Sequence, residues 1–118
     1  MPKLLVIDDV ADTVEVIKLM FELEGFEVIG VYDHYNLLAT IADFSPDVII
    51  LDVHLAGKDG RDISKLLKTG KSTREIPIVL MSASEHLHDA EKSYPADAYI
   101  AKPFDIDDIV NTVKGLLK

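Results

Sequence analysis

Five short apolar runs alternate with helical patterns along the whole chain. The runs have the length of strands, and we expect strands near 3–8, 26–31, 47–52, 76–81 and 97–101. Because parallel strands need crossover connections, this alternation favours an α/β fold with a parallel sheet and helices on both faces. With 118 residues, 48% of them hydrophobic, the chain is expected to form one domain over residues 1–118.

The segments between the runs carry helical patterns that stop at helix breakers. The first, over 10–24, ends at Gly25, a residue suited to the left-handed C′ position. Its apolar residues at helical spacing predict a buried stripe of Val16, Ile17, Met20 and Phe21. Further helices are expected over 35–43, 60–69 and 85–93, and after Asp105, which is an N-cap candidate.

Composition excludes several classes of function. The formal net charge of −9 repels nucleic acid and anionic membranes, so we expect neither as a partner. The absence of cysteine excludes a thiolate metal site and fits a reducing compartment. No signal-peptide pattern is present, and no apolar stretch approaches the ~20 residues of a membrane helix. We therefore expect a cytoplasmic protein.

Acidic residues follow two of the apolar runs where each strand is expected to end. Asp8 and Asp9 follow the run Leu4–Ile7. Asp52 follows the run Val48–Leu51. Open α/β sheets bind ligands at the carboxyl ends of their strands, and carboxylates gathered there repel one another unless a hard cation joins them. The three aspartates therefore predict a Mg²⁺ site and chemistry on oxyanions such as phosphate.

Two other strand ends add a hydroxyl and an ammonium group. Ser82 follows the fourth run, and Lys102, with Pro103 after it, follows the fifth. A metal held by carboxylates, a spare carboxylate as nucleophile, a hydroxyl donor and a lysine together make a phosphoryl-transfer site. The expected product is an aspartyl phosphate.

In order and spacing, these motifs resemble those of the receiver domain of two-component response regulators, over the whole chain. The matching motifs are Asp8-Asp9, Leu51-Asp52-Val53 with Asp59-Gly60, Ser82-Ala83, and Tyr99 with Lys102-Pro103-Phe104. The resemblance implies a (βα)₅ flavodoxin-like fold, a doubly wound parallel sheet with strand order 2-1-3-4-5 counted along the chain. That order would bring the three aspartates side by side.

The resemblance also implies how the acidic residues act. Asp52 would attack the phosphorus of a phosphohistidine on a sensor histidine kinase or histidine phosphotransfer protein, or of a small donor such as acetyl phosphate. Asp9, Asp52 and the backbone carbonyl of His54 would ligate Mg²⁺ directly, and Asp8 would act through water. The His54 side chain stands where many members have Met, and it is placed to overhang the site and change the lifetime of the phosphoryl group.

The remaining motif residues would carry the signal. Lys102, joined to Pro103 by a cis peptide bond in the family, would pair with a phosphoryl oxygen. Ser82 would hydrogen-bond the phosphoryl group and move toward it, and Tyr99 would enter the vacated space from an outward rotamer. The change would reach the surface of the fourth helix, fifth strand and fifth helix, where a downstream protein effector would bind.

Three hypotheses are compatible with an acidic site of this kind. The favoured one is a phosphoaccepting signalling module, not a turnover enzyme, whose chemistry is limited to its own phosphorylation and dephosphorylation. The alternative is a Mg²⁺-dependent phosphohydrolase with an aspartyl-phosphate intermediate, but such enzymes carry a second acid where this chain has His54. A flavodoxin-like mononucleotide binder ranks last, because the segment 8–12 is acidic where a phosphate loop would be needed.

Two valines of the first helix are candidates for partner docking. Val10 and Val14 lie one turn apart, off the predicted buried stripe, so we expect both to be exposed near Asp52. They would form part of the surface that receives a helix of the kinase or phosphotransfer protein.

Overall fold

The computed structural model describes residues 1–55, 58–83 and 96–117, and within them five parallel strands form one sheet. The strands are β1 (Lys3–Ile7), β2 (Glu27–Val31), β3 (Val48–Asp52), β6 (Ile78–Ala83) and β7 (Ala98–Lys102). Their order in the sheet is β2-β1-β3-β6-β7. Counted along the chain this is 2-1-3-4-5, so the predicted doubly wound sheet is confirmed.

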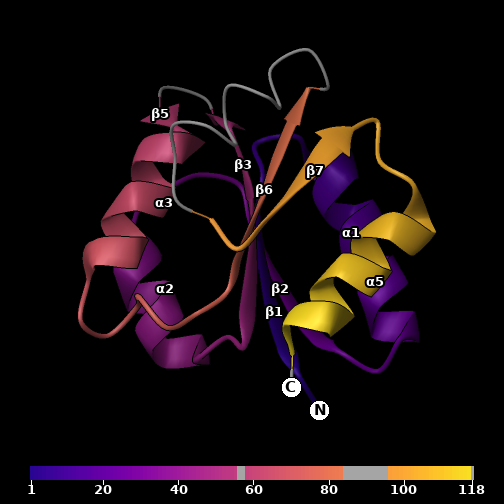
Figure 1. Cartoon of the computed structure of the whole chain (residues 1–118), viewed down its shortest axis with the longest axis horizontal. Coiled ribbons are helices and arrows are strands. Elements are labelled where there is room, and N and C mark those ends of the chain that lie inside the picture. Colours follow the sequence, from indigo (N-terminus) through magenta and orange to yellow (C-terminus); the bar gives the residue numbers. More distant parts are fainter. Residues whose placement is uncertain (56–57, 84–95, 118) are drawn as a thin grey trace.

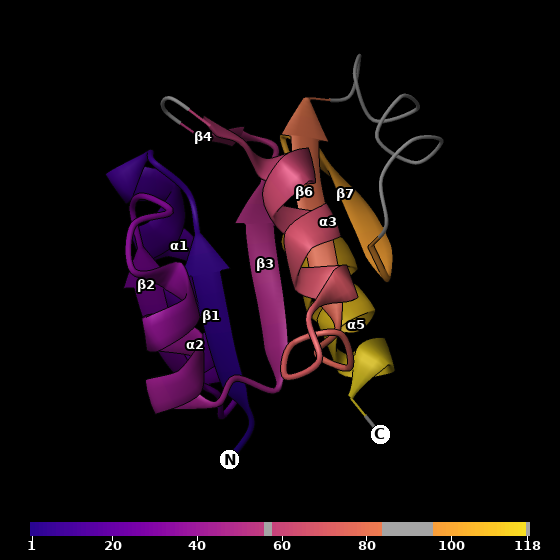
Figure 2. The same cartoon turned by 90° about the vertical axis from the view of Figure 1, so that its left-hand side faces the viewer.

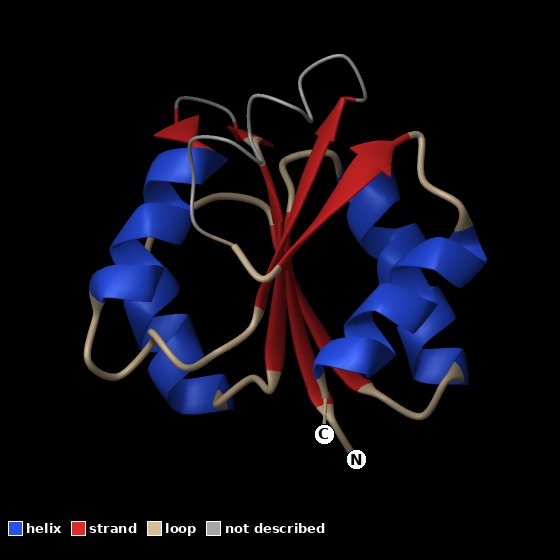
Figure 3. Cartoon of the chain, in the orientation of Figure 1, coloured by secondary structure: helices blue, strands red, loops and turns tan. Residues whose placement is uncertain are grey.

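Helices cover both faces of this sheet. The described helices are α1 (Ala11–Leu23), α2 (Leu37–Phe44), α3 (Gly60–Thr69) and α5 (Ile106–Leu116). Figure 1 shows α1 and α5 on one side of the sheet and α2 and α3 on the other, and Figure 3 shows the same layers by type of element. The helix expected over 85–93 lies outside the described residues. Among the described residues, no helix is long and apolar enough to cross a membrane.

The helix boundaries follow the local chemistry of their end residues. Gly25, two residues after the end of α1, has a φ of 89°, the left-handed conformation predicted for it. The carboxylate of Asp105 accepts hydrogen bonds from the backbone N–H groups of Asp107 and Asp108, which confirms it as the N-cap of α5. Both positions were predictable because a cap depends on the residue itself and not on distant packing.

The core consists of two apolar layers, one on each face of the sheet. Alternate residues of each central strand contribute to opposite layers, so that Leu4 and Val6 of β1 pack toward α1 and α5 while Leu5 and Ile7 pack toward α2 and α3. All four are completely buried. In strands that are buried on both faces, polar side chains are accommodated at the strand ends, and the candidate site lies at such ends.

The predicted buried stripe of α1 was partly wrong. The residues of α1 that are fully buried are Val14, Ile17 and Phe21, which recur at i, i+3 and i+7, whereas Val16 is 49% exposed. Val14, expected at the surface, is 1% exposed because it packs over Gly30 of β2. A Cβ at Gly30 would lie 2.2 Å from Val14 Cγ1, so the glycine provides the space that this valine fills.

Two features of the strands also differ from expectation. β6 continues to Ala83, so Ser82 lies inside the strand and not after it. Two short antiparallel strands, β4 (His54–Leu55) and β5 (Lys58–Asp59), form a hairpin above β3 that the sequence pattern did not predict. Figure 2 shows this hairpin at the carboxyl edge of the sheet, next to the end of β3.

Candidate functional site

The register of the central strands brings the acidic residues together. β1 and β3 are parallel neighbours with Ile7 opposite Leu51, so Asp8, which follows β1, and Asp52, the last residue of β3, meet at the carboxyl edge. One carboxylate oxygen from each of Asp8, Asp9 and Asp52 lies within 4.8 Å of the others. The predicted clustering of the three aspartates is therefore confirmed.

Two of these carboxylates are inside the protein. Asp8 is 0% and Asp52 is 3% exposed, whereas Asp9 is exposed to solvent. The backbone N–H of Val10 donates to Asp8 Oδ1 at 2.9 Å, and that of His54 donates to Asp52 Oδ1 at 3.3 Å. Among the described residues each buried carboxylate thus has one backbone donor, which is less than a charged, buried group needs for full compensation.

Lys102, the last residue of β7, contacts both buried carboxylates. Its Nζ lies 2.9 Å from Asp8 Oδ2 and 3.3 Å from Asp52 Oδ2, and the Lys102–Pro103 peptide bond is cis. Burial opposes the charge of Lys102, but the hydrogen bond to Asp8 and the negative charges of both aspartates outweigh it and raise the pKa of the ammonium group. Lys102 is therefore a stable cation shared between two strands.

One lysine does not neutralise this cluster. Burial, and next to it the negative charge of Asp8, raise the pKa of Asp52 to about 6, although Lys102 and the His54 N–H act in the opposite direction. Three carboxylates against one ammonium group leave an excess of negative charge among hard oxygen ligands. This donor set fits Mg²⁺, which prefers carboxylate oxygens and water.

The raised pKa of Asp52 predicts a pH-dependent contribution to stability. Between the ordinary value of 3.8 and about 6 the folded state binds more protons than the unfolded state. The contribution of this group to the free energy of unfolding therefore grows as pH falls through 6, and its ionisation costs roughly 2 to 3 kcal/mol at neutral pH.

We accordingly expect Asp52→Asn to raise the free energy of unfolding at pH 7.5 without Mg²⁺, and to do so much less at pH 5. Urea unfolding of both proteins at the two pH values measures the difference. Asp43→Asn, which removes an exposed carboxylate of α2, is the control and should change little. A gain from Asp52→Asn that is the same at both pH values would contradict the assignment of this charge as the source.

Ser82 and Tyr99 lie on the next two strands. Asp52 is opposite Met81 in the register of β3 and β6, so Ser82 is one residue further along the neighbouring strand. Ser82 is fully buried and donates a long hydrogen bond of 3.3 Å to the carbonyl of Ala83. Tyr99, on the edge strand β7, is partly buried and packs against the core layer below α2 and α3.

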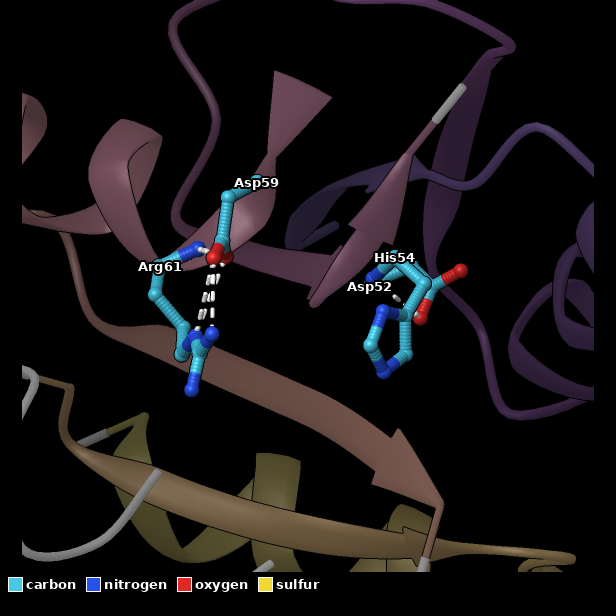
Figure 4. A network of polar contacts seen from close by, with 4 residues as sticks. All are labelled: Asp52, His54, Asp59 and Arg61. Carbon is cyan, nitrogen blue, oxygen red and sulfur yellow. Dashed lines mark hydrogen bonds and ion pairs between the residues drawn. The ribbon is translucent and has the colours of Figure 1, made fainter. Parts of the chain in front are cut away.

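The loop after Asp52 is held by a second polar pair, which the sequence analysis did not identify. Asp59 accepts from the Arg61 backbone N–H, and its two oxygens accept from Arg61 Nε and Nη2 at 2.8 to 3.1 Å (Figure 4). The Arg61 side chain thereby lowers the pKa of Asp59. The sequence signal for this pair was an aspartate at the start of a helical pattern, which is typical of an N-cap, two residues before an arginine.

Gly60 lets the start of α3 approach the end of β3. Its backbone N–H donates to the Val53 carbonyl at 2.7 Å, and a Cβ at Gly60 would lie 2.0 Å from the Asp52 carbonyl oxygen. No side chain fits in that space without a shift of the backbone. The position of Asp52 therefore depends on the glycine that begins α3.

Comparisons with known proteins match this site and fold. Residues 4–114 match the family model of the response regulator receiver domain. The chain is 32% identical over 117 residues to the phosphate regulon transcriptional regulatory protein PhoB of Pseudomonas aeruginosa, which covers 98% of the chain and 51% of PhoB. It is 28% identical to protein PilG of the same species, over 96% of the chain and 85% of PilG. The structure of the receiver domain of Francisella response regulator 1452 has a TM-score of 0.84 and 32% identity, over 98% of this chain and 96% of that one.

The chain belongs to the response regulator receiver domain family. The cluster of Asp8, Asp9 and Asp52 fits the phosphoacceptor site of the two-component regulators to which such domains belong. The chain spans about half the length of PhoB, which is a larger protein.

Proposed function

We propose that Asp52 accepts a phosphoryl group from a phosphohistidine and that residues 1–118 act as one receiver domain, a switch and not a turnover enzyme. The observation that carries this proposal is the position of Asp52. It is a buried carboxylate at a strand end, between the acid of Asp8 and the ammonium group of Lys102. A carboxylate that the protein leaves incompletely neutralised there is suited to act as a nucleophile once a cation is bound.

In the proposed transfer, a carboxylate oxygen of Asp52 attacks the phosphorus, and a P–O bond forms while the P–N bond of the phosphohistidine breaks. The imidazole of the donor leaves with the electron pair of that bond. Lys102, already 3.3 Å from Asp52 Oδ2, balances the negative charge of the phosphoryl oxygens. The hydroxyl of Ser82, which has only a long bond to a carbonyl among its described contacts, donates to another phosphoryl oxygen.

The residues proposed to hold Mg²⁺ are Asp9 and Asp52, with the backbone carbonyl of His54, while Asp8 acts through water. When bound, Mg²⁺ neutralises phosphoryl oxygens as the group is transferred. The clustering of the three carboxylates and the raised pKa of Asp52 support this assignment.

We expect Mg²⁺ to stabilise the fold, because it binds the native carboxylate cluster and not the unfolded chain; at 100 times its Kd the gain is about 2.7 kcal/mol. Asp9→Ala should remove most of this gain and most Mg²⁺-dependent labelling of the protein by acetyl phosphate. Thermal unfolding with and without Mg²⁺ and intact mass after labelling are the measurements. Asp12→Ala, an exposed acid of the first turn of α1, is the matched control. Equal losses in both variants would refute a role for Asp9 as a ligand.

We propose that phosphorylation is transmitted through Ser82 and Tyr99 to the surface of β7 and α5, where a protein effector binds. A hollow of about 370 Å³ beside Tyr99, also lined by Phe104, Asp108 and Thr112, supports this location. The partners proposed for these residues are proteins in the cytoplasm, without direct contact to nucleic acid or membrane, because the net charge is −9.

The donor is proposed to dock on the outer face of α1. Since Val14 is buried, the docking surface is instead formed by Val10 at the site and by the α1 stripe, defined as Val16, Leu19 and Leu23. These four residues are 49% to 79% exposed, and the last three recur at i, i+3 and i+7, which presents one apolar face to an incoming helix.

Leu19→Asp is expected to slow transfer from a cognate phosphohistidine donor about tenfold or more, since it places a charge in the centre of the apolar face. Labelling by acetyl phosphate should be unchanged, because this small donor needs no docking surface. Leu66→Asp on α3 is the matched control, because Leu66 and Leu19 are 60% and 61% exposed. If Leu19→Asp slowed both reactions equally, the effect would be structural and not one of docking.

A further inference from the structure

The helix layer formed by α1 and α5 is acidic, and the layer formed by α2 and α3 is not. With their cap residues, α1 and α5 span 10–24 and 105–117 and carry a formal charge of −5 in a chain of −9. With theirs, α2 and α3 span 36–45 and 59–70 and carry a formal charge of zero. Since the two layers lie on opposite sides of the sheet (Figure 1), the side that carries the α1 stripe is the one that attracts cations.

Three acids of α1 lie on the α1 stripe or next to it. Residues three, four or seven positions apart share one face of a helix. Asp12 is four residues before Val16 and seven before Leu19, so it continues the stripe toward the start of α1. Glu15 is four residues before Leu19 and Glu22 is three after it, so both border the stripe. All three carboxylates belong to exposed residues.

The protein does not neutralise these three acids. None of them forms an ion pair with any residue that the structure describes. Glu15 accepts a hydrogen bond of 3.3 Å from the hydroxyl of Tyr32, which is an uncharged donor. The apolar stripe is therefore bordered by carboxylates whose charge is available to a partner.

The two lysines of this helix layer do not offset that charge at the stripe. Lys18 is four residues after Val14 and three before Phe21, which are both buried, so it lies beside the buried face of α1 and is itself partly buried. Lys114 of α5 is paired with Glu24 at the end of α1. Neither lysine is thus a free cation on the exposed apolar face.

The acidic layer also affects the approach of a phosphoryl donor. A phosphohistidine carries a negatively charged phosphoryl group, which must reach the cluster of Asp8, Asp9 and Asp52. Like charges slow such an encounter, and cationic side chains on the partner reverse the effect. The partner that fits this side of the molecule offers apolar side chains to the α1 stripe and cations to its acidic border.

We propose that the donor of the phosphoryl group docks on the α1 stripe through a basic amphipathic helix, an inference that rests on the function proposed above. Apolar side chains of that helix contact the stripe, and Lys or Arg residues on its flanks meet Asp12, Glu15 and Glu22. A second copy of the chain does not fit, because two copies of this face would bring carboxylates together around the apolar contact.

Two synthetic helices with the same leucine stripe, about 14 residues or four turns long, test this proposal. One carries Lys on both flanks and the other carries Glu. In calorimetry at low salt with Mg²⁺, we expect the Lys peptide to bind at least about tenfold more tightly than the Glu peptide, and this preference should shrink as added salt screens the charges. In NMR spectra, the Lys peptide should shift the methyl resonances of Leu19 and Leu23.

Charge variants locate the preference. Glu15→Lys together with Glu22→Lys should remove the preference for the Lys peptide, because the border of the stripe is then no longer acidic. Asp43→Lys together with Glu75→Lys is the matched control, since it changes the net charge by the same amount at exposed acids outside α1 and α5. This control should keep the preference.

A pair of apolar variants tests the stripe itself. Leu19→Ser, which adds no charge, should weaken binding of the Lys peptide about fivefold or more. Leu66→Ser on α3 should not, although Leu66 is exposed to the same extent as Leu19, because it belongs to the other helix layer.

Equal affinity of the wild type for the two peptides, or equal loss of the preference in the two double variants, would overturn the proposal. So would resonance shifts at Leu38 and Leu66 in place of the α1 stripe, or a dimer in sedimentation experiments that Leu19→Ser dissociates. Labelling by acetyl phosphate tests the proposed function separately. Labelled Asp52 without a peptide preference would reject the basic donor helix and keep the acceptor, whereas a preference without labelling would keep the docking surface and reject the acceptor.

Discussion

Asp52→Asn is expected to lose phosphorylation by acetyl phosphate in Mg²⁺ by about a thousandfold or more. The amide cannot act as the nucleophile. Among the described carboxylates, only Asp8 shares with Asp52 a buried position at a strand end and a contact with Lys102. Intact mass of the labelled protein is the measurement. The variant should remain folded, because the amide removes a buried charge that raises the energy of the native state.

The control for this experiment is Asp43→Asn, which changes an exposed carboxylate of α2 outside the acidic cluster and should be labelled like the wild type. Equal labelling of Asp52→Asn and the wild type would reject Asp52 as the acceptor. Peptide mapping would show whether the label moves to Asp8 in the variant. Such a move would mean that Asp8 can also act as an acceptor.

Gly60→Ala is expected to destabilise the fold by about 2 to 3 kcal/mol and to slow labelling of Asp52 at least about tenfold. The new Cβ would lie 2.0 Å from the Asp52 carbonyl oxygen and 2.9 Å from Val53 Cα, so the backbone that carries the acceptor must move. Urea unfolding gives the stability, and the rate of labelling by acetyl phosphate gives the effect on the site.

Gly115→Ala is the matched control for this substitution. Gly115 lies in α5, where a Cβ added to it would have nothing within 4 Å, so alanine there should be neutral or stabilise the helix by several tenths of a kcal/mol. A similar loss of stability in both variants would show that the effect at residue 60 comes from the unfolded chain and not from contact with Asp52.

The strand ends were predictable from the sequence because they depend on a sharp change in chemistry. A run that is apolar at every position must be buried on both faces, so an aspartate directly after it marks the point where the strand leaves the core. Asp8 and Asp52 therefore both lie at the carboxyl edge of the sheet. They meet there because β1 and β3 are neighbouring strands. The ends of the fourth and fifth apolar runs placed Ser82 and Lys102 at the same edge, although both lie within strands that extend one residue or more beyond the predicted ends.

The orientation of α1 was not predictable in the same way. Apolar residues occupy almost all sides of this helix, so periodicity alone allowed the stripe of Val16 as well as that of Val14. The decision lies in β2, where Gly30 leaves a space that Val14 fills. A contact between residues this far apart is visible once the register of the strands is known, and a single sequence does not contain it.

The hairpin β4–β5 and the exposed leucines of α2 and α3 were missed for a related reason. Each hairpin strand has two residues, too few for a pattern with a period of two to appear. The exposure of Leu38 and Leu66 depends on how far apart the two helices pack, which their own sequences do not specify. Local chemistry was therefore informative at caps and strand ends, and uninformative about surfaces formed between elements.

Lys102 has a further consequence, because it joins residues 94 positions apart through its contact with Asp8. Synthesis proceeds from the N-terminus, so a growing chain presents all three aspartates before it contains the cation that pairs with two of them. Until β7 has joined the edge of the sheet, the carboxylates repel one another without compensation. A chain that lacks β7 therefore keeps three mutually repelling carboxylates without the cation that contacts two of them.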